Sequence, residues 1–210
     1  MECGEHGLFW QVFDWFEEMV REKRVEPDSV TMMSLVSACS QSGDLERGRW
    51  IYSCSEEKVF VKENLQLSNA IVDMYCECGD LASARELFEG MDECDVLTWT
   101  SVTAGSATAG SFGESLELFG RMQQESIRPD EVVTVAVLLA CSQMGALDQG
   151  KYVHLLLERF KIRRDVVLET ALVDTHAKCG SLDCVMQVFE TMKERNVFTW
   201  NAMIGGLGWQ

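Results

Sequence analysis

The chain has 210 residues, of which 47% are hydrophobic and 25% are charged, and its formal net charge is −16. This is an ordinary composition for a soluble protein, and no run of about 18 apolar residues is present that could span a membrane. The strong acidity argues against a generic nucleic-acid binder, because such proteins usually carry a basic patch. Only two prolines, Pro27 and Pro129, interrupt the chain, which favours a mostly helical structure.

The cysteines raise the question of a metal or redox site. Nine cysteines without a secretory signal indicate free thiols in a reducing compartment. The stretch MYCECGDL at 74–81 has a counterpart, THAKCGSL, at 175–182. Cys78 recurs there as Cys179, whereas Ala177 takes the place of Cys76. This pattern favours a small buried residue of a repeat over a pair of metal ligands.

Helices are predicted along the whole chain by apolar residues at i, i+3, i+4 and i+7. Four such faces end at Met19, Met91, Met122 and Met192. Before three of them lies another apolar stretch that ends at Gly79, Gly110 or Gly180, where glycine suits the left-handed residue that stops a helix. An Asp or Ser one residue later can cap the next helix.

The predicted helices form a repeat. Segment 67–99 matches segment 168–200 at a constant spacing, from Leu67 to Leu168 and from Trp99 to Trp200, and segment 35–52 matches 138–154. Each unit is a helix–turn–helix of about 31 to 36 residues, and such a pair buries its apolar face only by stacking on its neighbours. The sequence therefore predicts an all-α solenoid.

Three segments carry a family resemblance: RPDEVVTVAVLLACSQMGALDQGKYVH, NAIVDMYCECGDLASARELFEGM and VFTWNAMIGG. They resemble the plant pentatricopeptide repeat family, in the PLS subclass, where standard, long and short units alternate. The fold that this implies is all-α, one right-handed α-solenoid domain of helix–turn–helix repeats. Tetratricopeptide repeats fit less well, because their period is constant and they lack the Pro-Asp ending seen at 27–28 and 129–130.

The resemblance also gives a register. In chain order we expect a partial standard unit at 1–28, a long unit at 29–64, a short unit at 65–95, a standard unit at 96–130, a long unit at 131–165, a short unit at 166–196 and a partial standard unit at 197–210. Because both end units are incomplete, we expect a chain truncated at both ends, with apolar surface exposed there. Solenoids normally end in polar capping repeats.

In this family each unit is similar to a reader of one base of single-stranded RNA, through its fifth and last residues. An ionised Asp only accepts hydrogen bonds, which suits the ring N–H of uracil or guanine, whereas Asn can donate to adenine or cytosine. By resemblance, Asn at the fifth position favours pyrimidines and Thr favours purines. The expected base-reading residues are Asn69 with Asp95 for U (or C), Thr100 with Asp130 for G, and Thr170 with Asn196 for A.

The two long units carry apolar fifth residues, Met33 and Val135, and are expected to read little. The expected footprint is thus 5′-U-G-x-A-3′. Asn, Thr and Asp at helix starts are also common capping residues, and the family register alone favours contact with a base.

By the same resemblance, an apolar residue at the second position of a unit wedges the base. Leu97, Val132, Val167 and Phe198 fit this role, as does Val30, whereas Gln66 departs from it. Lys178, at the thirteenth position, is the expected phosphate contact. The other complete units carry Gln41, Glu77, Thr108 and Gln143 there.

No catalytic residue, metal site or cofactor is expected, and the chain is predicted not to be an enzyme. His6, His154 and His176 are scattered without a zinc-binding spacing, and no phosphate-binding loop, nucleophile elbow or zinc-deaminase signature occurs. Trp99 and Trp200 are expected to anchor first helices in the core.

The expected function is therefore sequence-selective binding of single-stranded RNA in organellar RNA modification (editing) or processing. The resemblance implies a mitochondrial or chloroplast location, although no transit peptide is visible, and other organellar RNA-editing factors as further partners. Membranes and DNA are not expected as partners. The alternative is a protein–protein interaction scaffold or a diverged fragment that no longer reads RNA, which the acidity and the missing lysines favour.

Overall fold

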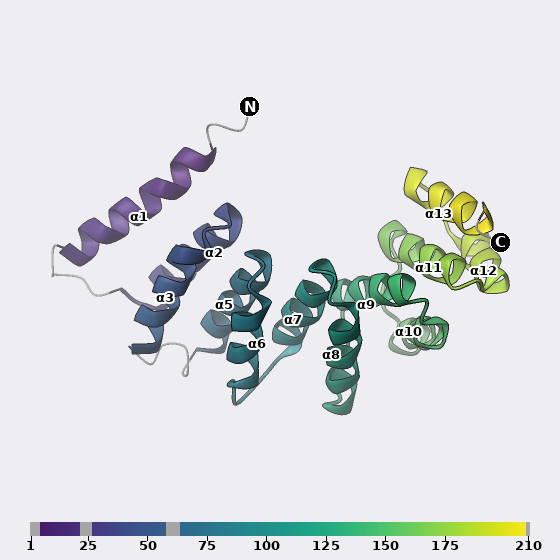
Figure 1. The fold of residues 1–210 in the computed structure, drawn as a ribbon, viewed down its shortest axis with the longest axis horizontal. Helices are drawn as coiled ribbons and strands as arrows, with labels where there is room; N and C mark the ends of the chain where they lie inside the picture. The colour runs from purple at the N-terminus through teal and green to yellow at the C-terminus, as the bar shows by residue number, and fades with distance from the viewer. Residues whose placement is uncertain (1–4, 22–26, 58–63, 209–210) are drawn as a thin grey trace. The chain divides into compact units, whose positions relative to one another are not determined.

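The computed structural model describes residues 5–21, 27–57 and 64–208, and every regular element in these ranges is an α-helix (Figure 1). The helices are α1 (Glu5–Arg21), α2 (Ser29–Ser42), α3 (Leu45–Glu57), α5 (Leu65–Glu77), α6 (Leu81–Glu89), α7 (Val96–Thr108), α8 (Phe112–Gln124), α9 (Glu131–Met144), α10 (Leu147–Phe160), α11 (Val166–Lys178), α12 (Leu182–Thr191) and α13 (Val197–Gly208). The all-α prediction is confirmed.

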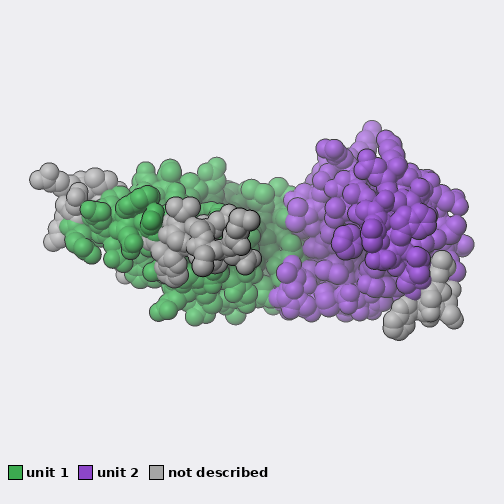
Figure 2. Space-filling view, turned by 90° about the horizontal axis from the view of Figure 1, so that it is seen from above, with its two compact units in different colours: residues 1–105 green, residues 106–210 purple. Residues whose placement is uncertain are grey.

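The chain forms two compact units, residues 1–105 (unit 1) and 106–210 (unit 2), coloured separately in Figure 2. In unit 1, α2 packs against α1, α3 and α5, and α5 also packs against α3 and α6. In unit 2, α9 packs against α8, α10 and α11, and α11 also packs against α10, α12 and α13. Each unit is thus a stack of helix pairs, which is the arrangement of a repeat solenoid.

We call α2, α5, α7, α9, α11 and α13 the first helices. They begin at Ser29, Leu65, Val96, Glu131, Val166 and Val197, the residues at which the expected units begin. The assignment of these units to long, short and standard types stays a prediction.

Glycine ends several first helices, as predicted. Gly79, Gly110 and Gly180 have φ angles of 79°, 81° and 75°, in a region that a side chain makes costly. Gly43 and Gly145 act in the same way after α2 and α9, with φ of 69° and 65°.

The predicted caps one residue after these glycines are only partly correct. Asp80 accepts a hydrogen bond from the backbone N–H of Ser83 at 3.2 Å and so caps α6. Ser111 and Ser181 precede α8 and α12 but make no side-chain capping bond, so the prediction is wrong for both serines. A hydroxyl is one of several groups that can occupy such a position, and its presence alone does not fix the bond.

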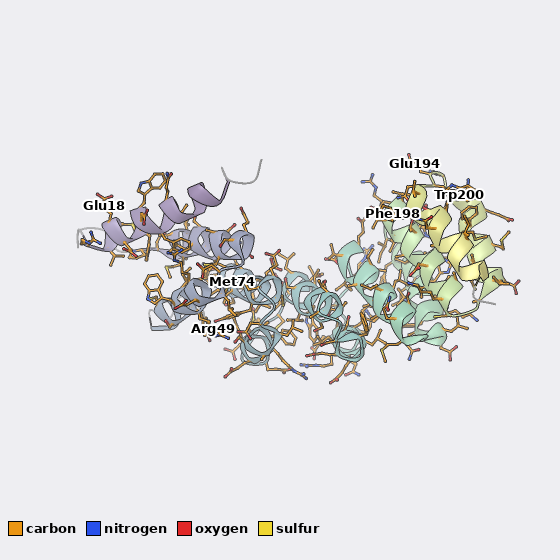
Figure 3. The ribbon with its side chains drawn as sticks, turned by 45° about the horizontal axis from the view of Figure 1, so that its top comes forward. Glu18, Arg49, Met74, Glu194, Phe198 and Trp200 are labelled. Carbon is orange, nitrogen blue, oxygen red and sulfur yellow. The ribbon has the colours of Figure 1, made fainter. Side chains whose placement is uncertain are left out.

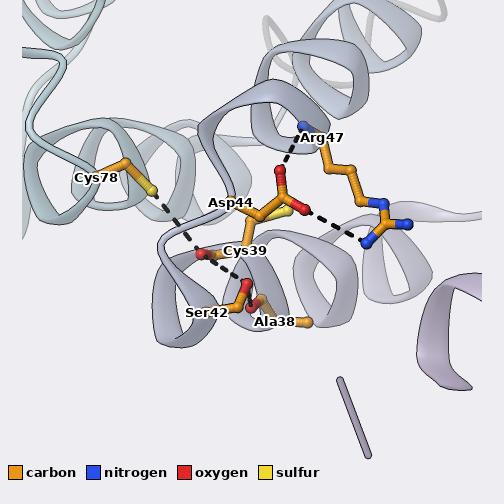
Figure 4. Close-up of polar contacts among 6 residues, drawn as sticks. All are labelled: Ala38, Cys39, Ser42, Asp44, Arg47 and Cys78. Atoms are coloured by element: carbon orange, nitrogen blue, oxygen red, sulfur yellow. Dashed lines mark hydrogen bonds and ion pairs between the residues drawn. The ribbon is translucent and has the colours of Figure 1, made fainter. Parts of the chain in front are cut away.

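The cysteines of the repeat lie at contacts between helix pairs. The Cys78 thiol donates to the carbonyl oxygen of Cys39 at 3.8 Å (Figure 4), and Cys179 contacts the carbonyl of Cys141 at the same distance. Burial raises the pKa of both donor thiols, which keeps them protonated and able to donate. The same close-up shows Asp44 at the start of α3, with its carboxylate bound to the backbone N–H and the guanidinium of Arg47.

The two tryptophans differ. Trp99 is 4% exposed and packs edge-on against Phe88, so the predicted core role is correct. Trp200 makes the same contact with Phe189 but stays 49% exposed on α13 (Figure 3), so the prediction fails there.

Helices α11 and α13 approach closely at a glycine, which yields the first prediction. A Cβ atom on Gly206 would lie 2.2 Å from the Cβ of Ala177 and 3.0 Å from its Cα. We expect Gly206→Ala to lower the free energy of unfolding by about 1–3 kcal/mol, measured by urea unfolding, because the rigid neighbour cannot move aside.

The adjacent glycine is the matched control. A Cβ atom on Gly205 would meet nothing within 4 Å. Gly205→Ala should therefore raise the free energy of unfolding by about 1 kcal/mol through helix propensity. Equal effects of the two substitutions would contradict the close approach of α11 and α13.

A buried histidine pair joins α10 to α11. The Nε2 atom of His176 lies 3.3 Å from the Nδ1 atom of His154, and the His176 side chain is fully buried. Burial lowers the pKa of His176 from 6.5 to about 4, and the charges of His154 and Lys151 act in the same direction. Burial also lowers the pKa of His154.

This pair predicts a pH dependence of stability. The unfolded chain takes up protons near the ordinary pKa of 6.5 and the folded chain only near 4, so the unfolded state binds more protons between these values. Stability should therefore fall as the pH drops from 6.5 to 4. His176→Leu should flatten the melting temperature over this window. An unchanged slope in the variant would contradict the assignment, since Asp28 and Asp80, whose pKa values are lowered, titrate below it.

Candidate nucleic-acid interface

The last residue of each expected unit caps the first helix that follows it. In every case the Oδ1 atom accepts a hydrogen bond from the backbone N–H three residues later. The bonds are Asp28 with Thr31 (2.8 Å), Asn64 with Leu67 (3.1 Å), Asp95 with Thr98 (3.0 Å), Asp130 with Val133 (2.8 Å), Asp165 with Leu168 (2.8 Å) and Asn196 with Thr199 (2.9 Å). The capping interpretation is therefore correct for these residues. Each capping bond uses only the Oδ1 atom, so the other side-chain atom can still bind a ligand.

The two residues expected to read the first base come together. The amide Nδ2 of Asn69, on α5, donates to the Oδ1 atom of Asp95 at 3.0 Å, before the start of α7. The hydroxyl of Thr98, the third residue of α7, donates to the Oδ1 atom of Asn69 at 2.6 Å. Asn69 is only 7% exposed. Both of its side-chain polar atoms form hydrogen bonds with neighbours in unit 1.

The pair expected to read the last base is joined through a third residue. The hydroxyl oxygens of Thr170, on α11, and Thr199, on α13, lie 2.7 Å apart. The hydroxyl of Thr199 also lies 3.0 Å from the Oδ1 atom of Asn196. Thr199 therefore links the fifth and last residues of this repeat at the start of α13.

Thr98 and Thr199 were not among the residues predicted from the sequence. They occupy the same place, the third residue of a first helix, and each connects a fifth residue to a last residue. One signal could have found them: each stands directly before a tryptophan, Trp99 or Trp200, in the repeated segments.

The remaining expected pair is divided between the two units. Thr100 lies in unit 1, where its hydroxyl donates to the carbonyl of Val96 at 2.7 Å. Asp130 lies in unit 2, where it caps α9 and its carbonyl accepts from the Thr134 hydroxyl at 2.6 Å. Their action on one base stays a prediction.

The expected base-wedging residues are exposed although they are apolar. The exposed fractions are 58% for Leu97, 57% for Val132, 55% for Val167 and 73% for Phe198, and Val30 shows 60%. Each is the second residue of a first helix, and Figure 3 shows Phe198 at the start of α13. Five of the six first helices therefore present an exposed apolar side chain at their second position.

In unit 2 the first helices line a groove of about 970 Å³. Of the predicted site residues, Val167, Thr170, Lys178 and Phe198 line it. The other lining residues are Val135, Leu139, Ser142, Ala171, Asp174, Thr175, Ala177, Gly180, Asn201, Ala202, Gly205 and Gly206. Asn201 is the fifth residue of the last expected unit and was not predicted as a site residue, although the register contained it. Asp130 and Val132 line a separate, smaller pocket of about 490 Å³.

Charge differs between the two copies of this surface. In unit 2, the Lys178 ammonium lies 2.9 Å from the carboxylate of Asp174, which also accepts from Ser142. The equivalent residues in unit 1 are Asp73 and Glu77, which accept from the hydroxyls of Ser101 and Ser40 respectively. Burial raises the pKa of Asp73, and the charge of Glu77 acts in the same direction.

In the part of the chain that the structure describes, no three His, Cys, Asp or Glu side chains gather in a way that could hold a metal ion. None of its helices has both the length and the apolarity that crossing a bilayer requires.

Comparison with known proteins gives the family. The protein-family model described as "PPR repeat" matches residues 30–58, 68–96 and 97–127. The family model described as "Pentatricopeptide repeat domain" matches residues 152–209. A mitochondrial pentatricopeptide repeat-containing protein of Arabidopsis thaliana is 36% identical over 226 residues, which cover 90% of this chain and 32% of the relative. A chloroplastic one is 36% identical over 184 residues, which cover 87% and 25%.

Solved structures show the same fold. The crystal structure of the pentatricopeptide repeat protein PPR10 in complex with an 18-nt psaJ RNA element aligns with a TM-score of 0.73 at 16% identity. It covers 96% of this chain and 30% of that one. Nuclear proteinaceous RNase P 2 of A. thaliana aligns with a TM-score of 0.67 at 15% identity, over 85% of this chain and 41% of that one.

The chain spans between a quarter and a third of the length of the two Arabidopsis relatives. The matched models together cover most of the chain and agree with the stacked helix pairs. The chain belongs to the pentatricopeptide repeat family.

Proposed function

We propose that this chain binds single-stranded RNA along its first helices, at about one base per repeat, without catalysing a reaction. The observation that carries the proposal is the hydrogen bonding that links the fifth and last residues of the two expected short repeats. Asn69 binds Asp95 directly, and Thr170 is linked to Asn196 through Thr199. An exposed apolar side chain, Leu97 or Phe198, stands two residues after the last residue of each pair. Hydrogen bonding to a base edge and apolar contact with its face need such an arrangement.

The charge of the groove in unit 2 supports RNA as the ligand. Its two charged lining residues, Lys178 and Asp174, form an ion pair and leave the groove without net charge. A neutral groove does not repel a polyanion, even though the whole chain carries a charge of −16. The solved structure of the related fold that holds an RNA element supports the same ligand class.

The relatives support a biological setting for the proposed RNA binding. Two of them are named as mitochondrial and chloroplastic proteins, which supports an organellar location for this chain. The alternation of unit lengths supports the PLS subclass. On this basis we extend the proposal to organellar RNA modification (editing) or processing. We propose other organellar RNA-editing factors as partners.

A second candidate function rests on unit 1. Asp73 and Glu77 occupy the places that Asp174 and Lys178 hold in unit 2, so two acids stand where one acid and one base stand in the other copy. Such a surface suits a basic segment of a protein partner better than a phosphate chain. A protein-interaction scaffold is therefore the alternative to RNA binding.

The direct test is a gel-shift titration at low salt with oligonucleotides that contain UGxA or UAxG. We expect tighter binding to UGxA, because exchanging the purines places the wrong ring edge opposite Asp130 and Asn196. The discrimination should be roughly 30-fold, since hydrogen bonds at two bases are lost and each contributes about 1 kcal/mol net. Equal or absent binding to both oligonucleotides would contradict the proposal and favour the scaffold.

Lys178 and Asp174 give an independent prediction. Lys178→Gln should weaken binding to all sequences equally and lower the slope of log K against log salt by about 0.7, because one phosphate contact is lost. Asp174→Asn should strengthen binding roughly twofold or more, since it frees the ammonium from its ion pair. Lys151→Gln is the control, because it removes the same charge from α10, the second helix of its repeat. It should change neither the affinity nor the salt dependence. If Asp174→Asn weakened binding, the ion pair would not compete with RNA.

A further inference from the structure

We propose that Thr98 and Thr199 are positioning residues that determine which hydrogen-bonding groups the base-reading residues present to RNA. The inference rests on the proposed RNA binding. It changes the reading unit from a pair of residues into three, of which the third belongs to the first helix of the following repeat.

The contacts around Thr98 close into a ring. The backbone N–H of Asp95 donates to the Thr98 hydroxyl at 3.1 Å, and this hydroxyl donates to the Oδ1 atom of Asn69 at 2.6 Å. The Nδ2 atom of Asn69 then donates to the Oδ1 atom of Asp95 at 3.0 Å. A hydroxyl has one proton, and the shorter contact, to Asn69, takes it in preference to Asp95 Oδ1 at 3.1 Å.

The ring fixes what is left over for a ligand. Within the described chain it leaves unused one hydrogen of the Asn69 amide, a donor, and the Oδ2 atom of Asp95, an acceptor. A donor beside an acceptor can pair with the Watson–Crick edge of a base, where a ring nitrogen and an exocyclic group have opposite character. Without the Thr98 hydroxyl, the buried Oδ1 atom of Asn69 loses its donor, and the amide must turn to find another.

Thr199 controls a hydroxyl in the same way. Thr199 lies 2.7 Å from the Thr170 hydroxyl and 3.0 Å from Asn196 Oδ1, and it has one proton to give. When the proton goes to Asn196, Thr170 donates to Thr199 and can only accept from a base. When it goes to Thr170, the proton of Thr170 is available to a base. Thr199 thus couples the state of the fifth residue to that of the last residue.

The hydroxyl is not needed to start the helix. Helices α5, α9 and α11 have apolar third residues, Leu67, Val133 and Leu168, and are capped by the same backbone bond. In both expected short repeats the polar fifth residue, Asn69 or Thr170, is paired with a threonine at the third position of the next first helix, Thr98 or Thr199. After the two expected long repeats, whose fifth residues are the apolar Met33 and Val135, the third residue is Leu67 or Leu168. The pairing does not extend to Thr100, because the third residue of the next first helix is Val133.

The experiment measures discrimination base by base. Binding of UGxA, and of oligonucleotides with each other base at the first or last position, is measured by fluorescence anisotropy for the wild type, Thr98→Val and Thr199→Val. We expect Thr98→Val to reduce discrimination at the first base by roughly three- to tenfold and to leave the last base unaffected, and Thr199→Val to do the reverse. Thr98→Ser and Thr199→Ser, which keep the hydroxyl, should restore the wild-type values.

Thr134→Val is the matched control. Thr134 is also a buried threonine near the start of a first helix, and its hydroxyl donates to the carbonyl of Asp130. This variant should lose stability to a similar degree in thermal melts while discrimination at the first and last bases stays unchanged.

Three outcomes would overturn the inference while leaving RNA binding intact: unchanged discrimination in both valine variants, an equal loss at every base in both, or failure of the serine variants to restore it. Absence of binding by the wild type to all the oligonucleotides would instead show that the proposed function is wrong, and the inference with it.

Discussion

The start of each first helix depends on one hydrogen bond, from a backbone N–H to the side chain of the last residue of the preceding repeat. Asp95 and Asn196 are examples, and the bond holds both the helix and the chain that enters it. Such a cap stabilises a helix by about 1 kcal/mol. The same side chain is therefore fixed in space before any ligand arrives, which reduces the entropy lost when a base binds. Under the proposed function, the residue that caps a first helix is also a preorganised contact for a base.

Buried and exposed residues alternate along each first helix, so that one helix both packs in the stack and presents the surface that we propose to bind RNA. On α11, Leu168 and Leu172 are fully buried against neighbouring helices, whereas Val167 faces solvent. Lys178 stands one helix length away from Val167, at the other end of the same groove. The stacking that buries the core therefore also sets the spacing between an apolar contact, a polar contact and a cation. Because the helix pairs repeat, the same spacing between these positions recurs from one repeat to the next.

The sequence was sufficient for features that depend on residues close together in the chain. Apolar spacing gave the helices, and the φ angles of Gly79, Gly110 and Gly180 agree with the predicted turns. It failed where a distant neighbour decides: the exposure of Trp200 depends on which helices cover it. The hydroxyls of Thr98 and Thr199 were missed for the same reason, since their partners Asn69 and Thr170 lie in the preceding repeat and only packing brings them together.

The central claim is that each base lies at the start of a first helix. Photocross-linking tests it most directly, with 4-thiouridine at the first position of a UGxA oligonucleotide and mass spectrometry of the linked peptide. We predict linkage to the start of α7, at or near Leu97, because this exposed residue stands two positions after Asp95, which binds the Asn69 amide. Linkage confined to the second helices α3 or α6 would contradict the account.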